Sequence, residues 1–257
     1  QEYFDGGAEV SLDIHVKNVD TLIVKVYELN AQNYYRQELQ QVSTGIKLDG
    51  LVANVERTIK YEEAPLRREV RHFDFPELNR PGVFVIDFIG NGKSSRTLVR
   101  KGKLDFLVQA TTAGHRFTVL GEEKQPVEDA SIWINGTLYE AGEDGTIRVP
   151  FSTNPGMVPF VVTDGSTTTL HRFQHEAEQY QLTAGIYVDR EALLERRLAP
   201  VMIRPALSLN GTPVTLSVLE DVRLTISSVD HDGIRVTSRV DDFELHEGEE
   251  TVHEFRV

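Results

Sequence analysis

A short glycine-rich stretch has the residue types of a phosphate-binding loop. The segment Gly90-Asn91-Gly92-Lys93-Ser94 contains Gly-Lys-Ser after an apolar run, and in nucleotide-binding loops this pattern cradles phosphate. That motif needs its first glycine where Asp87 stands, and it needs a following helix, whereas residues 96–100 alternate like a strand. Asn-Gly is also the preferred pair of a two-residue hairpin turn. The stretch therefore predicts a β-hairpin rather than a nucleotide site.

Two histidines four residues apart, His171 and His175, have the spacing of a metal-binding pair. A zinc site needs three or four ligands, and no third ligand is recognisable nearby. Gln179 stands where a zinc-peptidase helix would carry its second histidine. We therefore expect surface histidines, no metal and no other cofactor.

The sequence does not assemble a catalytic set. The chain has no cysteine, which excludes thiol nucleophiles, disulfides and internal thioesters, and it lacks the Gly-x-Ser-x-Gly motif of a serine nucleophile. Carboxylates are numerous, but no pattern selects two of them as an acid and base pair. We expect no enzymatic activity, with a hydrolase domain kept as an alternative.

A run of basic residues begins at Lys93 and continues through Arg96 and Arg100 to Lys103 without an acid. Positive charge commonly protects the exposed edge of a β-sheet, and we favour that interpretation. The alternatives are an anionic glycan or a neighbouring acidic module, for which residues 241–254 are a counterpart because they carry seven carboxylates and no Lys or Arg.

Trp133, the only tryptophan, lies between Ile132 and Ile134. In a strand the indole points away from both isoleucines, and we expect the isoleucines in the core and the indole at a module interface. Aromatic and basic side chains together give the candidate binding surface. It comprises Tyr34, Tyr35, Trp133, Tyr139, Lys93, Arg96 and Arg100.

Strands must position these residues, because apolar and polar residues alternate along most of the chain. We expect a hairpin between residues 10–16 and 21–29. Further turns with hairpin signals are expected at Asn91-Gly92, Asn135-Gly136, Asp144-Gly145, Asn210-Gly211 and Asp232-Gly233. Two short helices are predicted, one from the cap Asn30 to about Gln41 and one near 190–198, capped by Asp189 and ended by Pro200.

The fold class that follows is all-β, with tandem antiparallel β-sandwich modules and one or two short helices. A length of 257 residues allows two or three domains. The predicted modules are residues 1–103, 104–165 and 166–257. The polar stretch 165–169 is the expected exit from the second module.

Charge and hydropathy limit the partners. The chain has 27 Lys and Arg against 40 Asp and Glu, and its formal net charge of -13 disfavours nucleic acid. Its apolar runs are far shorter than the roughly 20 residues of a membrane span, so we expect no membrane insertion. Gln1 in place of an initiating methionine, and a strand-like pattern at 252–257, indicate a piece of a longer chain.

Residues 125–134 and 143–151 resemble the β-sandwich modules of α2-macroglobulin-like proteins and of carboxypeptidase-regulatory-like domains. Residues 19–29 resemble the opening strand pair of bacterial macroglobulin modules, and residues 80–86 resemble their closing strand. The resemblance covers about 150 residues and implies serial macroglobulin-like or immunoglobulin-like sandwiches.

This resemblance implies a non-catalytic structural and interaction segment of a large secreted or cell-envelope protein. Its partners would be other modules of the same chain, with a protein or glycan ligand as the alternative. The reactive thioester of the best-known members needs a cysteine that this chain lacks, so only the scaffold role carries over.

Overall fold

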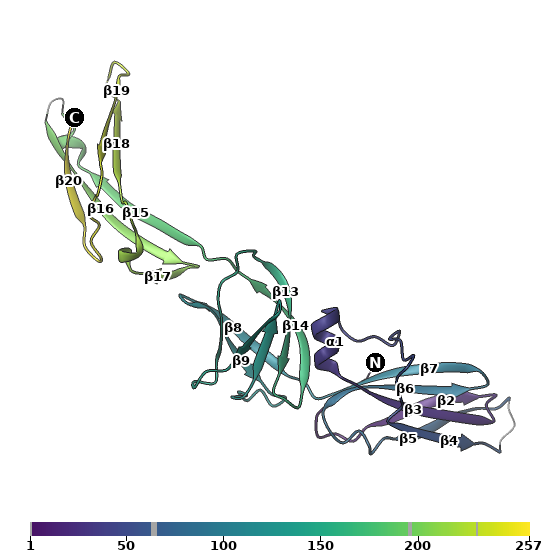
Figure 1. Cartoon of the computed structure of the whole chain (residues 1–257). Coiled ribbons are helices and arrows are strands. Elements are labelled where there is room, and N and C mark those ends of the chain that lie inside the picture. The colour runs from purple at the N-terminus through teal and green to yellow at the C-terminus, as the bar shows by residue number, and fades with distance from the viewer. Residues whose placement is uncertain (1, 63–65, 195–196, 230) are drawn as a thin grey trace. The chain divides into compact units, whose positions relative to one another are not determined.

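The computed structural model describes residues 2–62, 66–194, 197–229 and 231–257, and most of its regular structure is β-strand (Figure 1). The chain divides into two compact units. Unit 1 contains residues 1–109 and 113–176, and unit 2 contains residues 110–112 and 177–257. The predicted all-β class is confirmed.

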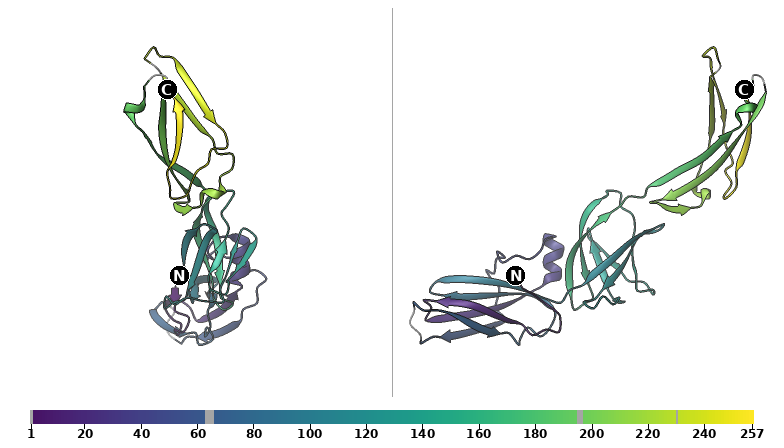
Figure 2. Two further views of the ribbon diagram at one scale, coloured as in Figure 1. Left: turned by 90° about the vertical axis from the view of Figure 1, so that its left-hand side faces the viewer. Right: turned by 180° about the vertical axis from the view of Figure 1, so that it is seen from behind.

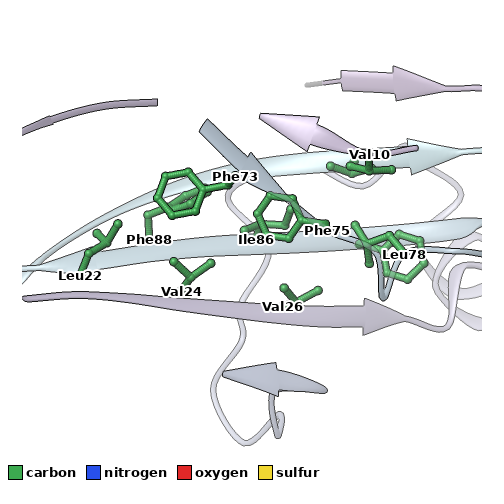
Figure 3. Close-up of a cluster of buried hydrophobic side chains, with 11 residues drawn as sticks. Val10, Leu22, Val24, Val26, Phe73, Phe75, Leu78, Ile86 and Phe88 are labelled. Atoms are coloured by element: carbon green, nitrogen blue, oxygen red, sulfur yellow. The ribbon is translucent and has the colours of Figure 1, made fainter. Parts of the chain in front are cut away.

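The first sandwich of unit 1 has a five-stranded and a two-stranded sheet. The larger sheet has the order β1 (Glu2–Phe4), β7 (Lys93–Lys101), β6 (Gly82–Gly90), β3 (Thr21–Leu29) and β4 (Val55–Lys60), and the smaller pairs β2 (Ser11–Lys17) with β5 (Arg68–Asp74). The strands are antiparallel except that β1 runs parallel to β7. Phe73 of β5 meets Phe88 of β6 edge to face in the core between the sheets (Figure 3).

The expected hairpin between residues 10–16 and 21–29 is wrong. β2 pairs with β5, whereas β3 pairs with β4 and β6, so these consecutive strands lie in different sheets. Both strands have one apolar face to bury, and placing them in facing sheets buries both faces in one core. Alternation predicts each strand but does not say which strand it pairs with.

The second sandwich of unit 1 contains seven strands in two sheets. One sheet has the order β11 (Thr137–Glu140), β10 (Ser131–Ile134), β13 (Gly156–Thr163) and β14 (Thr168–His175), and the other has the order β12 (Ile147–Val149), β9 (Gly114–Leu120) and β8 (Asp105–Thr111). Phe117, Phe160 and Phe173 form its aromatic core, with ring centroids 4.9 to 5.5 Å apart.

β14 lies beyond residue 165, where the second module was expected to end. It pairs with β13 over eight residues, so both strands belong to one sheet. The intervening polar stretch is a tight turn, in which the side chain of Asp164 accepts hydrogen bonds from the backbone N–H groups of Ser166 and Thr167. The Ser/Thr-rich segment therefore closes a hairpin and is not the exit from the module.

Unit 2 is a smaller sandwich. One sheet joins β15 (Tyr180–Val188), β16 (Leu198–Leu209), β17 (Thr212–Val214) and β20 (Thr251–Arg256), and the other pairs β18 (Leu224–Val229) with β19 (Arg235–Val240). Its core contains Val201, Ile203 and Phe255. Figure 2 shows β15 and β16 as a long green pair.

Of the two predicted helices, the first is confirmed as α1 (Ala31–Glu38), where the side chain of Asn30 accepts a hydrogen bond from the N–H of Asn33 at 2.9 Å. The helix predicted near 190–198 is wrong among the described residues, since only the single 3₁₀ turn η1 (Arg190–Ala192) forms. Residues 195–196 of that prediction lie outside the described residues.

The C-terminal end of the predicted second helix belongs instead to strand β16, because every second residue there points into the core of unit 2. Ala199 and Val201 are buried, and Pro200 between them points the other way. Val201 is paired with Val188, the last residue of β15, so Pro200 lies beyond the end of that neighbour and its missing N–H leaves no gap in the ladder.

The Asn-Gly turns are confirmed as hairpins. Asn91-Gly92, Asn135-Gly136 and Asn210-Gly211 each join paired strands, and all six residues have positive φ. Asp232-Gly233 lies between the paired strands β18 and β19. Asp144-Gly145 differs, because it connects β11 and β12, which belong to different sheets.

Candidate interaction surfaces

Helix α1 and the loop after it fill the space between the two sandwiches of unit 1. Tyr35 from the helix and Val42 from the loop are buried in a cluster that is separate from both sandwich cores. This junction cluster also receives side chains from β6 and β7 of the first sandwich and from β13 and β14 of the second. Its buried members are Tyr27, Ala31, Tyr35, Val42, Leu48, Val83, Val85, Leu98, Val161 and Leu170.

The strands that line the junction cluster are apolar on both faces. Along β6, Val83 and Val85 point into the junction cluster, whereas Phe84 and Ile86 point into the core of the first sandwich. Along β13, Val161 faces the junction cluster while its neighbours face the second core. An unbroken apolar run in a strand is typical of burial on both sides, so residues 83–86 carried a signal for this interface that sequence analysis did not use.

Polar groups within the junction are hydrogen-bonded across it. The hydroxyl of Tyr35 donates to Oε1 of Gln41 at 3.3 Å, and Nε2 of Gln41 donates to the carbonyl of Leu170 in β14 at 3.1 Å. Nη2 of Arg100 donates to the carbonyl of Val42 at 2.5 Å. Burial raises the pKa of the Tyr35 hydroxyl, and the nearby Arg100 partly opposes that rise. These bonds connect the two sandwiches.

The interpretation of the basic run as a charged sheet edge is wrong for its C-terminal part. β1 pairs with residues 99–101 of β7, where Arg100 and Lys101 are buried, whereas residues 93–98 of β7 pair with β6 alone among the described strands. Lys101 Nζ donates to the carbonyl of Leu78 at 2.7 Å. Arg96 is half-buried, with its guanidinium 3.3 Å from Asp87 and bonded to the carbonyl of Ile46. Lys93 is exposed at the first position of β7.

Trp133 points toward the junction cluster, while Ile132 and Ile134 are buried in the second core, as alternation predicts. The guanidinium carbon of Arg36 lies 5.9 Å from the centroid of the indole, within cation–π range. Leu138 lies directly opposite Trp133 in the β10–β11 register and is 47% exposed. We call Arg36, Trp133 and Leu138 the Trp133 surface.

The predicted binding residues do not gather on one surface. Tyr34, Tyr35 and Trp133 all pack on the junction cluster, with Tyr35 fully buried. Tyr139 is paired with Ile132 and packs on the second core, on the opposite face of the sheet from Trp133. Leu138, and not Tyr139, lies beside the indole. Sequence analysis missed Leu138 because only the pairing register shows that it lies opposite Trp133.

The expectation of surface histidines is wrong for His171 and His175, because both lie on the core-facing side of β14. Nε2 of His171 donates to the carbonyl of Leu104 and Nε2 of His175 to that of Pro150, each at 2.8 Å. The buried His115 accepts a hydrogen bond from the N–H of Glu176. Burial lowers the pKa of His171, and burial together with the charge of His175 lowers that of His115.

These histidines hold loops and strands in place through backbone groups. Within the described ranges of the chain, no three His, Asp or Glu side chains are grouped to hold a metal ion. The helices described in the structure include none that is long and apolar enough to cross a membrane.

Comparison with known proteins identifies the class. A family model described as the AbpF first immunoglobulin-like domain matches residues 22–102, and one described as the AbpF third immunoglobulin-like domain matches residues 189–257. With the paired sheets described above, these matches show that residues 22–102 and 189–257 form immunoglobulin-like β-sandwich domains. It is similar to Actin-binding protein F of Dictyostelium discoideum, with 35% identity over 266 residues. The match covers 100% of this chain and 11% of that protein.

Two solved structures are similar at a lower level. Native alpha-2-macroglobulin from Escherichia coli, domains MG0-NIE-MG1, has 13% identity, a TM-score of 0.43, and coverage of 65% of this chain and 60% of that chain. Extracellular domains 3-5 of Drosophila OTK have 8% identity, a TM-score of 0.23, and coverage of 99% and 92%.

The expectation of a secreted or cell-envelope location is contradicted. The relative that matches the whole chain is named for binding actin, and actin belongs to the cytoskeleton inside cells. The resemblance to sandwich modules held for the fold, but the location that came with it did not, because one β-sandwich architecture serves unrelated functions in different compartments. The comparisons do not support a glycan ligand.

Proposed function

We propose that this chain is a non-catalytic protein-interaction segment of an actin-associated protein. The observation that carries the proposal is the 35% identity to Actin-binding protein F along the full length of the chain. The use of buried polar side chains supports a non-catalytic role, because His171, His175 and Lys101 each bind a backbone carbonyl and so serve the packing of the fold.

In this proposal the segment has three modules. They are residues 1–103, 104–176 and 177–257. The second module extends past residue 165 because it includes β14. The junction cluster supports treating the first two as a single rigid body, because its buried side chains come from both.

The proposed partner is actin, and the proposed contact is the Trp133 surface. Trp, Arg and exposed Leu side chains lie together there, and Trp and Arg are enriched among residues that dominate binding energy. Tyr35 and Arg100 are buried and have a structural role, and Tyr34 packs on the junction cluster. Tyr139 packs on the second core and Lys93 is exposed at the start of β7, so neither belongs to the proposed contact.

Co-sedimentation of the 257-residue chain with filamentous actin tests the proposal. Leu138→Glu introduces a charge beside the indole and should weaken binding about fivefold or more. Leu107→Glu is the matched control, since Leu107 is also an exposed strand leucine of the second sandwich, at 62% exposure, and it should bind like the parent chain. A parent chain that stays in the supernatant would overturn actin as the direct partner, and equal binding by both variants would overturn the Trp133 surface.

A further inference from the structure

Strand β15 is an unprotected sheet edge. In the described part of unit 2 it pairs with β16 alone, over nine consecutive residues without a bulge. Its sequence from Tyr180 to Val188 contains no charged residue and no proline. Natural proteins normally protect long edge strands with charges, prolines or bulges, because the free backbone groups can pair with another strand. β15 has none of these protections.

The backbone orientation of β15 follows from the hydrogen bond that begins its ladder. The N–H of Asn210 donates to the carbonyl of Gln179 at 2.9 Å, so odd-numbered residues of β15 direct their N–H and C=O groups toward β16. The even-numbered residues direct theirs away from β16. They are Tyr180, Leu182, Ala184, Ile186 and Val188.

The same even-numbered residues carry an apolar stripe. Leu182 lies opposite Leu207, and Ile186 lies opposite Ile203, and both partners in β16 are buried core residues. Directly opposed residues share a face of the sheet, so Leu182 and Ile186 are on its apolar side. They are nevertheless 51% and 65% exposed. The edge therefore presents backbone donors, backbone acceptors and apolar side chains together.

We propose that β15 pairs antiparallel with β15 of a second copy of this chain. The only register that uses all nine residues places Ala184 opposite itself on a two-fold axis. Leu182 of one copy then lies opposite Ile186 of the other, and Tyr180 lies opposite Val188, so apolar residues meet on one face.

The uncharged sequence of β15 allows two copies to meet at this edge despite their net charge. Two copies with a net charge of -13 repel each other, and β15 gives them a nine-residue contact on which no like charges meet. The two copies would share one sheet that continues from β16 through both β15 strands. A single strand pair is a small interface, so the dimer should be weak and concentration-dependent.

Cysteine cross-linking tests the register, because the chain has no cysteine of its own. In Ala184→Cys the two thiols belong to directly opposed residues, whose Cα atoms are about 5.5 Å apart in a hydrogen-bonded antiparallel pair, within disulfide range. Mild oxidation should give a covalent dimer on a non-reducing gel. Leu182→Cys is the control, because its two copies would lie roughly 13 Å apart along the strands. Combining Leu182→Cys with Ile186→Cys should restore cross-linking.

Sedimentation velocity tests the same contact without cross-linking. The parent chain should shift from monomer toward dimer as its concentration rises. Ala184→Pro removes the central N–H donor of each copy. Because this N–H points away from β16, the variant should keep its fold and its circular dichroism spectrum but stay monomeric. Ala184→Val keeps the N–H and should dimerise like the parent chain.

Three results would overturn the proposal. They are a parent chain that is monomeric at every concentration, an Ala184→Pro variant that dimerises as well as the parent, and Ala184→Cys cross-linking no faster than Leu182→Cys. A parent chain that is always monomeric would mean that the partner of β15, if it has one, is a strand of a different protein. None of these results depends on actin, so they are independent of the proposed function.

Discussion

At the scale of single residues, unit 1 buries charged and titratable side chains that composition would place on the surface. Arg100 and Lys101 follow each other in β7 and point to opposite faces, one to the carbonyl of Val42 and the other to that of Leu78. A buried cation is costly unless it is hydrogen-bonded, and carbonyl acceptors from ordered loops meet that need here. These cations therefore fix the loops that they contact.

The buried histidines predict a loss of stability in acid. The pKa values of His115 and His171 are lowered in the folded chain, so the unfolded chain binds more protons between the folded pKa and the ordinary value of about 6.5. Their contribution to the free energy of unfolding is fully present above pH 6.5 and is lost as pH falls toward the folded pKa. Urea unfolding of the whole chain between about pH 7.5 and pH 5 should show this loss.

His171→Phe and His72→Asn provide the controls for this pH dependence. His171→Phe removes one of the lowered groups and should flatten the profile. The hydrogen bond to Asp13 raises the pKa of the exposed His72, whose contribution is present below pH 6.5 and is lost as pH rises through its folded pKa. Removing His72 should therefore steepen the acid loss, and an unchanged profile in both variants would contradict the assignment.

At the scale of elements, local signals predicted what local geometry decides. Asn-Gly pairs gave three hairpins because both residues accept positive φ, and Asn30 gave the start of α1 because its side chain caps a free N–H. The pairing of β2 with β5 and the junction cluster could not be predicted in the same way, since both depend on contacts between distant segments. Leu138 was missed for this reason.

The same contrast explains the helix predicted near 190–198. Asp189 does cap a turn, with its carboxylate accepting from the N–H of Glu191. One turn of helix is marginal by itself, however, and the core of unit 2 instead takes Ala199 and Val201 as strand residues. Tertiary packing therefore outweighed the capping signal.

Removing the ring of Tyr35 should destabilise the junction. Tyr35 is among the largest fully buried side chains, and Tyr35→Ala should lower the free energy of unfolding by about 3 to 5 kcal/mol. Gln37→Ala changes an exposed residue of the same helix and should cost less than about 0.5 kcal/mol. Chemical denaturation measures both. Faster hydrogen exchange in β14 of Tyr35→Ala alone would show that the helix stabilises the second sandwich.

A side chain at Gly114, the first residue of β9, should meet a steric clash. It has φ +114°, and a Cβ there would lie 2.4 Å from the carbonyl oxygen of Val149 and 2.9 Å from Cα of Pro150. Gly136 also has positive φ, at +92°, but a Cβ there meets open space. Gly114→Ala should therefore cost on the order of 2 kcal/mol more than Gly136→Ala in thermal or chemical unfolding. Equal costs would mean that the strand end yields to the added methyl group.

At the scale of the whole molecule, the chain is two compact units with their own buried cores. Unit 1 combines two sandwich cores and the junction cluster, whereas unit 2 has one small core and a long exposed edge. Sequence periodicity predicted sandwich modules in series but not which of them share buried surface, because that depends on the second face of β6 and β13.

Two units predict two unfolding transitions in calorimetry. Tyr35→Ala should lower the transition temperature of unit 1 and leave the other transition in place. Ile203→Ala removes a buried side chain from unit 2 and should shift only the second transition, by the equivalent of about 2 to 5 kcal/mol. A single transition displaced by either variant would contradict independent folding of the units.

The junction cluster also determines where this polypeptide can be cut for laboratory work. A fragment that ends at residue 103 would keep α1 but lose the strands on its far side, and the complementary piece would carry Val161, Leu170 and the indole of Trp133 bare in water. Both pieces would be prone to precipitate, since newly uncovered hydrocarbon surfaces adhere to each other. Expression trials should therefore keep residues 1–176 together.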